Sequence, residues 1–115
     1  MAESVSDSVY LSIRINSELK TRFNLFCESK GIKPSLAVRH YIKRFVGGGI
    51  PMKFGEAKTV YAGCTVKVGV RMTAEMREAF SDACDVYGMP MSIFIRDFMK
   101  TCVESGEFPF DFMLD

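Results

Sequence analysis

Long apolar runs and an apolar N-terminal segment are missing from this sequence of 115 residues. No run approaches the roughly 20 apolar residues that a membrane-spanning helix needs. The first eight residues are acidic and rich in serine, unlike a signal peptide. We therefore expect a cytoplasmic protein with no membrane partner. Hydrophobic residues make up 48% and charged residues 25% of the chain, which indicates one globular domain over residues 1–115.

Residues for catalysis or metal binding are also scarce. The four cysteines are far apart and form no CxxC pair, so we expect reduced thiols rather than a zinc site or a disulfide framework. The single histidine, His40, has no strained turn beside it that could hold a nucleophile. The glycines at 47–49 follow an apolar helical stretch instead of opening a helix, which argues against a phosphate loop. We expect no enzyme, cofactor, metal or small-molecule substrate.

What the chain does contain is a repeat. At an offset of 57 residues, residues 9–49 align without a gap on residues 66–106, and eleven aligned positions are identical. Phe23 and Phe80 are one such pair, and most other pairs are conservative. We call positions 57 residues apart equivalent. A unit of about 40 residues seldom closes a core alone, so we expect the two copies to fold together.

Charge is divided unevenly between the two halves of the chain. Residues 1–58 carry ten Lys and Arg against five Asp and Glu, a formal charge of +5, whereas residues 59–115 carry five against nine, a formal charge of −4. The whole chain has a net charge of +1, which is less than DNA-binding proteins usually carry. Six of the eight methionines lie after residue 70, and surfaces rich in methionine adapt to protein partners.

Each copy begins with a predicted strand. Residues 9–15 and 66–72 alternate apolar and polar side chains with a period of two, which is typical of a half-buried strand. Asn16 and Thr73 follow these strands and are suitable N-caps for a helix. The order strand, helix, turn, helix is therefore predicted twice.

The predicted helices also have recognisable ends and apolar faces. Gly31 and Gly88 suit the end of the first helix of each copy, and the second helices begin near Pro34 and Met91. The apolar positions at helical spacing are Leu19, Phe23, Phe26, Cys27, Leu36, Val38, Ile42, Phe45 and Val46 in the first copy, and Met76, Phe80, Ala83, Cys84, Ile93, Ile95, Met99, Cys102 and Val103 in the second.

A single short strand can neither satisfy its backbone nor cover its apolar side. We therefore expect the two strands to pair antiparallel, either within one chain or between two chains. The inner face would carry Val9, Leu11, Ile13, Ile15, Val66, Val68, Val70 and Met72. The outer face would carry Tyr10, Ser12, Arg14, Lys67, Gly69 and Arg71. This outer face is polar and basic, and a two-stranded ribbon fits the major groove of B-DNA.

Three segments of each copy carry a resemblance to a known family. They are residues 12–19, 31–39 and 49–52 in the first copy and residues 70–76, 88–96 and 106–110 in the second. Each copy resembles a ribbon-helix-helix unit of the MetJ/Arc class, and within that class it is similar to the RelB/DinJ-type antitoxins. The presence of two copies in one chain resembles the plasmid-transfer regulator TraY.

The resemblance implies a mainly α fold with a small β-ribbon, in which the two repeats form an intramolecular pseudo-dimer with an antiparallel two-stranded ribbon and four helices. Repeat one would span residues 8–47 and repeat two residues 64–106, with a linker at 48–63 and an apolar tail at 107–115. The tail would either pack over the helices or dock to a protein partner.

The resemblance also implies a function, namely sequence-specific binding of double-stranded DNA by a repressor or autoregulator of phage, plasmid or bacterial origin. The base-reading residues would be Tyr10, Ser12, Arg14, Lys67 and Arg71. The phosphate-binding residues, at the start of the second helices, would be Lys33, Ser35 and Ser92. Because Gly69 has no side chain, we expect the site to be asymmetric. The alternatives are an ordinary solvated strand face and a proline that only starts a helix.

A second hypothesis assigns the same fold to a protein-binding inhibitor or antitoxin-like module, of the phage anti-defence type. Its contacts would come from the acidic, Met-rich second half and the apolar tail. Self-association on DNA is a further expectation from the resemblance. Arg39 and Arg96, at equivalent positions, are expected to support the fold through a carboxylate or else to contact the DNA backbone. His40 is expected to face solvent, with the alternative that it opposes the acid at the equivalent position, Asp97, across the pseudo-dyad.

Overall fold

The computed structural model describes residues 8–48 and 64–109, and these residues form four helices and two strands. The elements are β1 (Ser8–Asn16), α1 (Ser17–Lys30), α2 (Pro34–Val46), β2 (Cys64–Thr73), α3 (Ala74–Tyr87) and α4 (Met91–Ser105). The order strand, helix, helix thus occurs twice, as the repeat predicts. The expectation of a mainly helical fold with a small sheet is confirmed.

Local hydrogen bonds explain where the first helix of each repeat begins. The Asn16 side chain accepts from the backbone N–H groups of Glu18 and Leu19, with Oδ1 to nitrogen distances of 2.8 and 3.1 Å. Thr73 Oγ1 accepts from the Met76 N–H at 3.1 Å. Both side chains satisfy donors that a helix start leaves without a partner. The predicted N-caps are confirmed.

Local interactions also determine where α1 and α3 end. Gly31 and Gly88 each have a φ of 73°, in the left-handed region that side chains with a Cβ avoid. Their N–H groups donate to carbonyls of the last helical turn. These glycines therefore turn the chain sharply, so that the second helix of each repeat starts three residues later.

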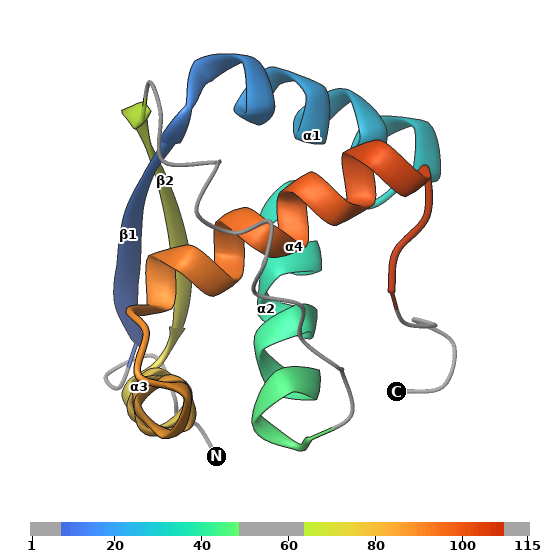
Figure 1. The fold of residues 1–115 in the computed structure, drawn as a ribbon. Coiled ribbons are helices and arrows are strands. Elements are labelled where there is room, and N and C mark those ends of the chain that lie inside the picture. Colours follow the sequence, from blue (N-terminus) through green and yellow to red (C-terminus); the bar gives the residue numbers. More distant parts are fainter. Residues whose placement is uncertain (1–7, 49–63, 110–115) are drawn as a thin grey trace.

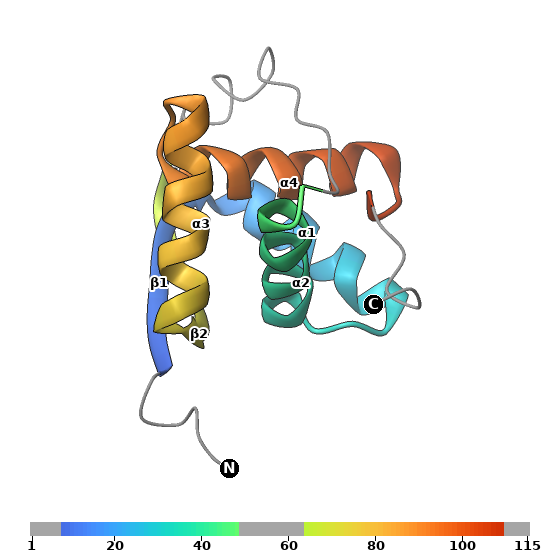
Figure 2. The same ribbon diagram turned by 90° about the horizontal axis from the view of Figure 1, so that it is seen from below.

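β1 and β2 pair antiparallel within one chain, with Tyr10 opposite Arg71, Ser12 opposite Gly69 and Arg14 opposite Lys67. All four helices lie on the same side of the two strands, and none of the described residues covers the other face of the ribbon (Figures 1 and 2). The residues of the inner face are all buried or half-buried, and those of the outer face are exposed. The predicted assignment of side chains to the two faces is therefore confirmed.

The core is shared between the repeats. The main helix contacts join α1 to α4 and α2 to α3, so each first helix packs on the second helix of the other repeat. At the centre, the rings of Tyr41 and Phe98 stack with centroids 4.4 Å apart and an interplanar angle of 15°. These two residues occupy equivalent positions. Because the contacts cross between repeats, neither repeat holds a complete core of its own.

Two side chains differ from their predicted environments. His40 is only 7% exposed, although we expected it to face solvent. The middle of α2 is buried on several sides, at positions 37, 38, 40, 41 and 42, because it packs against both α3 and β2. Leu36 is 43% exposed although it belongs to the predicted apolar face, while the equivalent Ile93 is 6% exposed. The first turn of α4 lies beside α3 and the ribbon (Figures 1 and 2), and Ile93 is buried there.

Cys27, Cys84 and Cys102 are buried free thiols, as expected for core positions. Of the predicted apolar tail, Phe108 packs on α1, with its ring centroid 4.8 Å from that of Phe26. Residues 110–115 of the tail and 49–63 of the linker lie outside the described residues. Within the described ranges, no helix has the length and apolar character to cross a membrane.

Candidate nucleic-acid interface

The uncovered face of the ribbon brings the five predicted base-reading residues onto one surface. Tyr10 is 63% exposed. The other outward positions, at 12, 14, 67, 69 and 71, are exposed as well. Three of these six residues are cationic and none is acidic. Strand pairing fixes their spacing, because side chains directly opposite each other in an antiparallel pair lie about 5 Å apart.

At one end of this face an arginine stacks on an aromatic ring. Arg71 Cζ lies 4.9 Å from the centroid of the Tyr10 ring, within the range of a cation–π interaction. The ring also extends diagonally over Gly69, since a Cβ built on Gly69 would lie 3.7 Å from Tyr10 Cε2. The Tyr10 ring therefore lies next to the exposed backbone of Gly69, and the two strands present different side chains to solvent.

The other end carries two cations side by side. Arg14 lies directly opposite Lys67, and both are exposed. Like charges at directly opposed positions destabilise a sheet. This arrangement costs free energy in the isolated chain, and a bound polyanion would remove the repulsion.

The outer edges of the ribbon are tied to the helices by the equivalent arginines. Arg96 Nε on α4 donates to the carbonyl oxygen of Arg14 at 2.7 Å. Arg39 Nη1 on α2 donates to the carbonyl oxygen of Arg71 at 3.3 Å. Each arginine thus bonds to the strand of the other repeat. Because edge carbonyls need partners, these bonds hold the ribbon in place, so both arginines support the fold through strand carbonyls.

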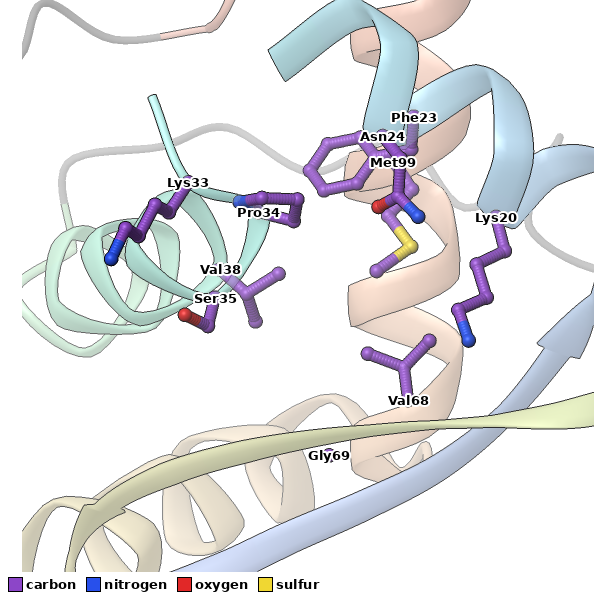
Figure 3. Close-up of a pocket in the computed structure, with 10 residues that line it drawn as sticks. All are labelled: Lys20, Phe23, Asn24, Lys33, Pro34, Ser35, Val38, Val68, Gly69 and Met99. Atoms are coloured by element: carbon purple, nitrogen blue, oxygen red, sulfur yellow. The ribbon is translucent and has the colours of Figure 1, made fainter. Parts of the chain in front are cut away.

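A hollow of about 380 Å³ lies beside the ribbon, between α1, the start of α2, β2 and α4 (Figure 3). It brings two predicted phosphate-binding residues, Lys33 and Ser35, to the same side of the molecule as Gly69. Lys33 extends away from the hollow, while Lys20 points from α1 towards β2 (Figure 3). Lys20 Nζ lies 3.5 Å from the carbonyl oxygen of Lys67. Ser92 lies at the start of α4 and does not line this hollow.

Lys20 lines the hollow but is not among the phosphate-binding residues predicted from the sequence. Its signal was present in the repeat, because the equivalent residue is Arg77 and both positions are basic. Lys20 on α1 and Lys33, which precedes α2, both line the hollow, although the Lys33 side chain extends away from it (Figure 3). Together with the N–H groups at the start of α2, they make this side of the ribbon partly positive.

The thiols of Cys27 and Cys84 are buried and are therefore expected to be unreactive. Burial raises the pKa of Cys27 to about 11 and that of Cys84 to about 12. Neutral thiols are poor nucleophiles and poor metal ligands. Among the described residues, no group of three or more His, Cys, Asp or Glu side chains is arranged to hold a metal ion.

Comparisons with protein-family models, with curated proteins and with solved structures find no match to this chain. The geometry and charge of the ribbon and of the hollow beside it are therefore the basis for assigning a function.

Proposed function

We propose that this chain is a tandem ribbon-helix-helix protein that binds double-stranded DNA in a sequence-specific manner. The observation that carries the proposal is the outer ribbon face, on which Arg14, Lys67 and Arg71 are exposed together and none of the six outward positions is acidic. A two-stranded ribbon has the dimensions of the B-DNA major groove. In this proposal the two repeats form an intramolecular pseudo-dimer, with one strand contributed by each.

The outward side chains supply the base contacts. Arginine and lysine suit the O6 and N7 acceptors of guanine, and the Ser12 hydroxyl can pair with several bases. Arg14 and Lys67 repel each other in the free chain, so the negative potential of the groove stabilises these two residues most. The edge bonds from Arg39 and Arg96 keep the ribbon rigid, so that little order has to be gained on binding.

Phosphate contacts come from the flanks of the ribbon. The start of α2 offers backbone N–H groups together with Lys33 and Ser35, and Lys20 adds a cation from α1. Ser92 takes the equivalent role at the start of α4. Such a protein acts in the cytoplasm as a repressor or autoregulator, and a second molecule beside it on the DNA would extend the contact.

Fluorescence anisotropy tests the proposal with duplexes enriched from a random-sequence pool and with the DNA upstream of the chain's own gene. We expect Arg14→Ala to weaken specific binding by about 1–3 kcal/mol. About six phosphate contacts would give a log–log salt slope of about −5. Arg22→Ala is the matched control, because Arg22 is an exposed arginine that pairs with Glu18 on α1 at 2.7 Å.

Two results would contradict the proposal. One is that no duplex binds more tightly than a scrambled sequence. The other is that Arg14→Ala and Arg22→Ala weaken binding equally, because that pattern would reflect net charge and not the ribbon.

One observation favours a second function, inhibition of a protein partner. Four exposed acidic residues follow one face of α3 at spacings of three and four, ending beside Val86, which is 83% exposed. These residues are Glu75, Glu78, Asp82 and Asp85. An acidic row beside an exposed apolar side chain suits a basic partner surface. If this function holds, Asp82→Lys abolishes capture of the partner and Arg14→Ala leaves it intact.

A further inference from the structure

The ribbon face is not uniform, and its first half is already assembled in the free chain. Arg71 stacks on the Tyr10 ring, and the edge of that ring lies beside Gly69. A Cβ built on Gly69 would lie 3.7 Å from Tyr10 Cε2, an ordinary contact distance. The carbonyl of Arg71 accepts from Arg39, which fixes the strand at this point. An apolar ring and a guanidinium therefore face solvent as one ordered unit.

We propose that the Tyr10–Arg71 pair is a specificity-determining unit that reads a thymine next to a guanine in the major groove. This inference rests on the proposed DNA-binding function and deepens it. A guanidinium donates to guanine O6 and N7, and an apolar group contacts the C5-methyl of thymine. The Tyr10 ring supplies the apolar surface beside the guanidinium, whose Cζ lies 4.9 Å from the ring centroid.

The other half of the face cannot read the same step. Arg14 and Lys67 are two cations in direct opposition, with no aromatic ring between them. They suit guanine acceptors and phosphates and offer little apolar surface for a methyl group. The bound sequence is therefore not a palindrome, and the chain lies on it in one direction. The equivalence of Ser12 and Gly69 gives the same asymmetry, because only the strand with serine can use a hydroxyl there.

The experiment begins with a duplex selected from a random pool by the wild-type protein. Each thymine is then replaced by deoxyuridine, which removes the methyl group and nothing else. We expect one position to weaken wild-type binding by about fourfold, as burial of one methyl group implies. Tyr10→Ala should lose this penalty and Tyr10→Phe should retain it. Arg14→Ala is the matched control, since it lies at the other end and should also retain the penalty.

The guanine is tested in the same duplex with 7-deazaguanine, which lacks the N7 acceptor. Replacement of the guanine beside the sensitive thymine should weaken wild-type binding by roughly tenfold, and it should have no further effect on Arg71→Ala. Tyr10 and Arg71 are both exposed, so these variants test recognition without disturbing the core.

The outcomes separate this inference from the function on which it rests. If the deoxyuridine penalty is the same in the wild type and in Tyr10→Ala, or if the selected sequence contains no thymine beside a guanine, the reading unit is wrong while sequence-specific binding stands. If no sequence is preferred at all, the proposed function fails and the reading unit fails with it.

Discussion

Several buried positions carry the same or similar residues in the two repeats, whereas one exposed helix face differs in charge. Phe23 and Phe80 are identical and buried, and Tyr41 stacks on its equivalent, Phe98. On the surface, the face of α3 that carries four acidic residues corresponds to a face of α1 with two. Each repeat completes the packing of the other, so a substitution at one of these core positions affects both repeats. The exposed faces of α1 and α3 are free of this constraint and carry different charges.

The largest expected effect concerns the shared core. Phe98→Ala removes the ring that stacks on Tyr41 and also contacts Phe23 at a centroid distance of 5.7 Å. We expect the free energy of unfolding to fall by about 3–5 kcal/mol, measured by urea denaturation. Leu25→Ala, at a position that is 60% exposed, is the control and should change stability by less than about 0.5 kcal/mol. Equal effects would mean that the repeats do not depend on a common core.

A second comparison separates two equivalent arginines. Arg96 is 6% exposed and donates to the Arg14 carbonyl at 2.7 Å, whereas Arg39 is more exposed and its bond is 3.3 Å long. We expect Arg96→Ala to cost about 1.5–3 kcal/mol and Arg39→Ala about 0.5–1 kcal/mol, measured by thermal or urea unfolding. If Arg39→Ala loses more stability than Arg96→Ala, the burial of the arginine does not determine how much each hydrogen bond to the ribbon contributes.

Alkaline pH tests whether the two equivalent buried thiols affect the free energy of unfolding. Burial raises the pKa of Cys27 to about 11 and that of Cys84 to about 12, from an ordinary value of 9.0. The unfolded chain thus loses these protons at lower pH than the folded chain does. The free energy of unfolding should be constant with respect to these groups below about pH 8 and fall as pH rises above about 9.

Urea unfolding at a series of pH values measures this slope. A variant with both Cys27→Ala and Cys84→Ala should have a shallower slope, even if it is less stable throughout. An unchanged slope would show that other groups cause the alkaline loss.

Local signals made most of the fold predictable. Strand formation and helix ends depend on residues close together in the chain, so they can be predicted from the sequence. Examples are the alternation of side chains, the Asn16 and Thr73 caps and the glycines at 31 and 88. The burial of His40 and the exposure of Leu36 depend on which helix crosses which. No local pattern contains that information. Pairing of the two predicted strands assigned the outward residues of the ribbon correctly. The stack of Arg71 on Tyr10 depends on side-chain conformation, which the sequence pattern does not specify.

The smallest expected effect concerns Ser12 and Gly69, which lie opposite each other in the ribbon. A Cβ on Gly69 would meet the Tyr10 ring at 3.7 Å, an ordinary contact distance, and the φ of Gly69 is not positive. Gly69→Ala should therefore stabilise the chain by about 0.5–1 kcal/mol, because glycine carries an entropic cost in a strand. Ser12→Gly should lose a similar amount, and both are measured by thermal unfolding. If Gly69→Ala destabilises the chain, the Tyr10 ring needs the bare backbone, and the asymmetry of the ribbon is a requirement of its packing.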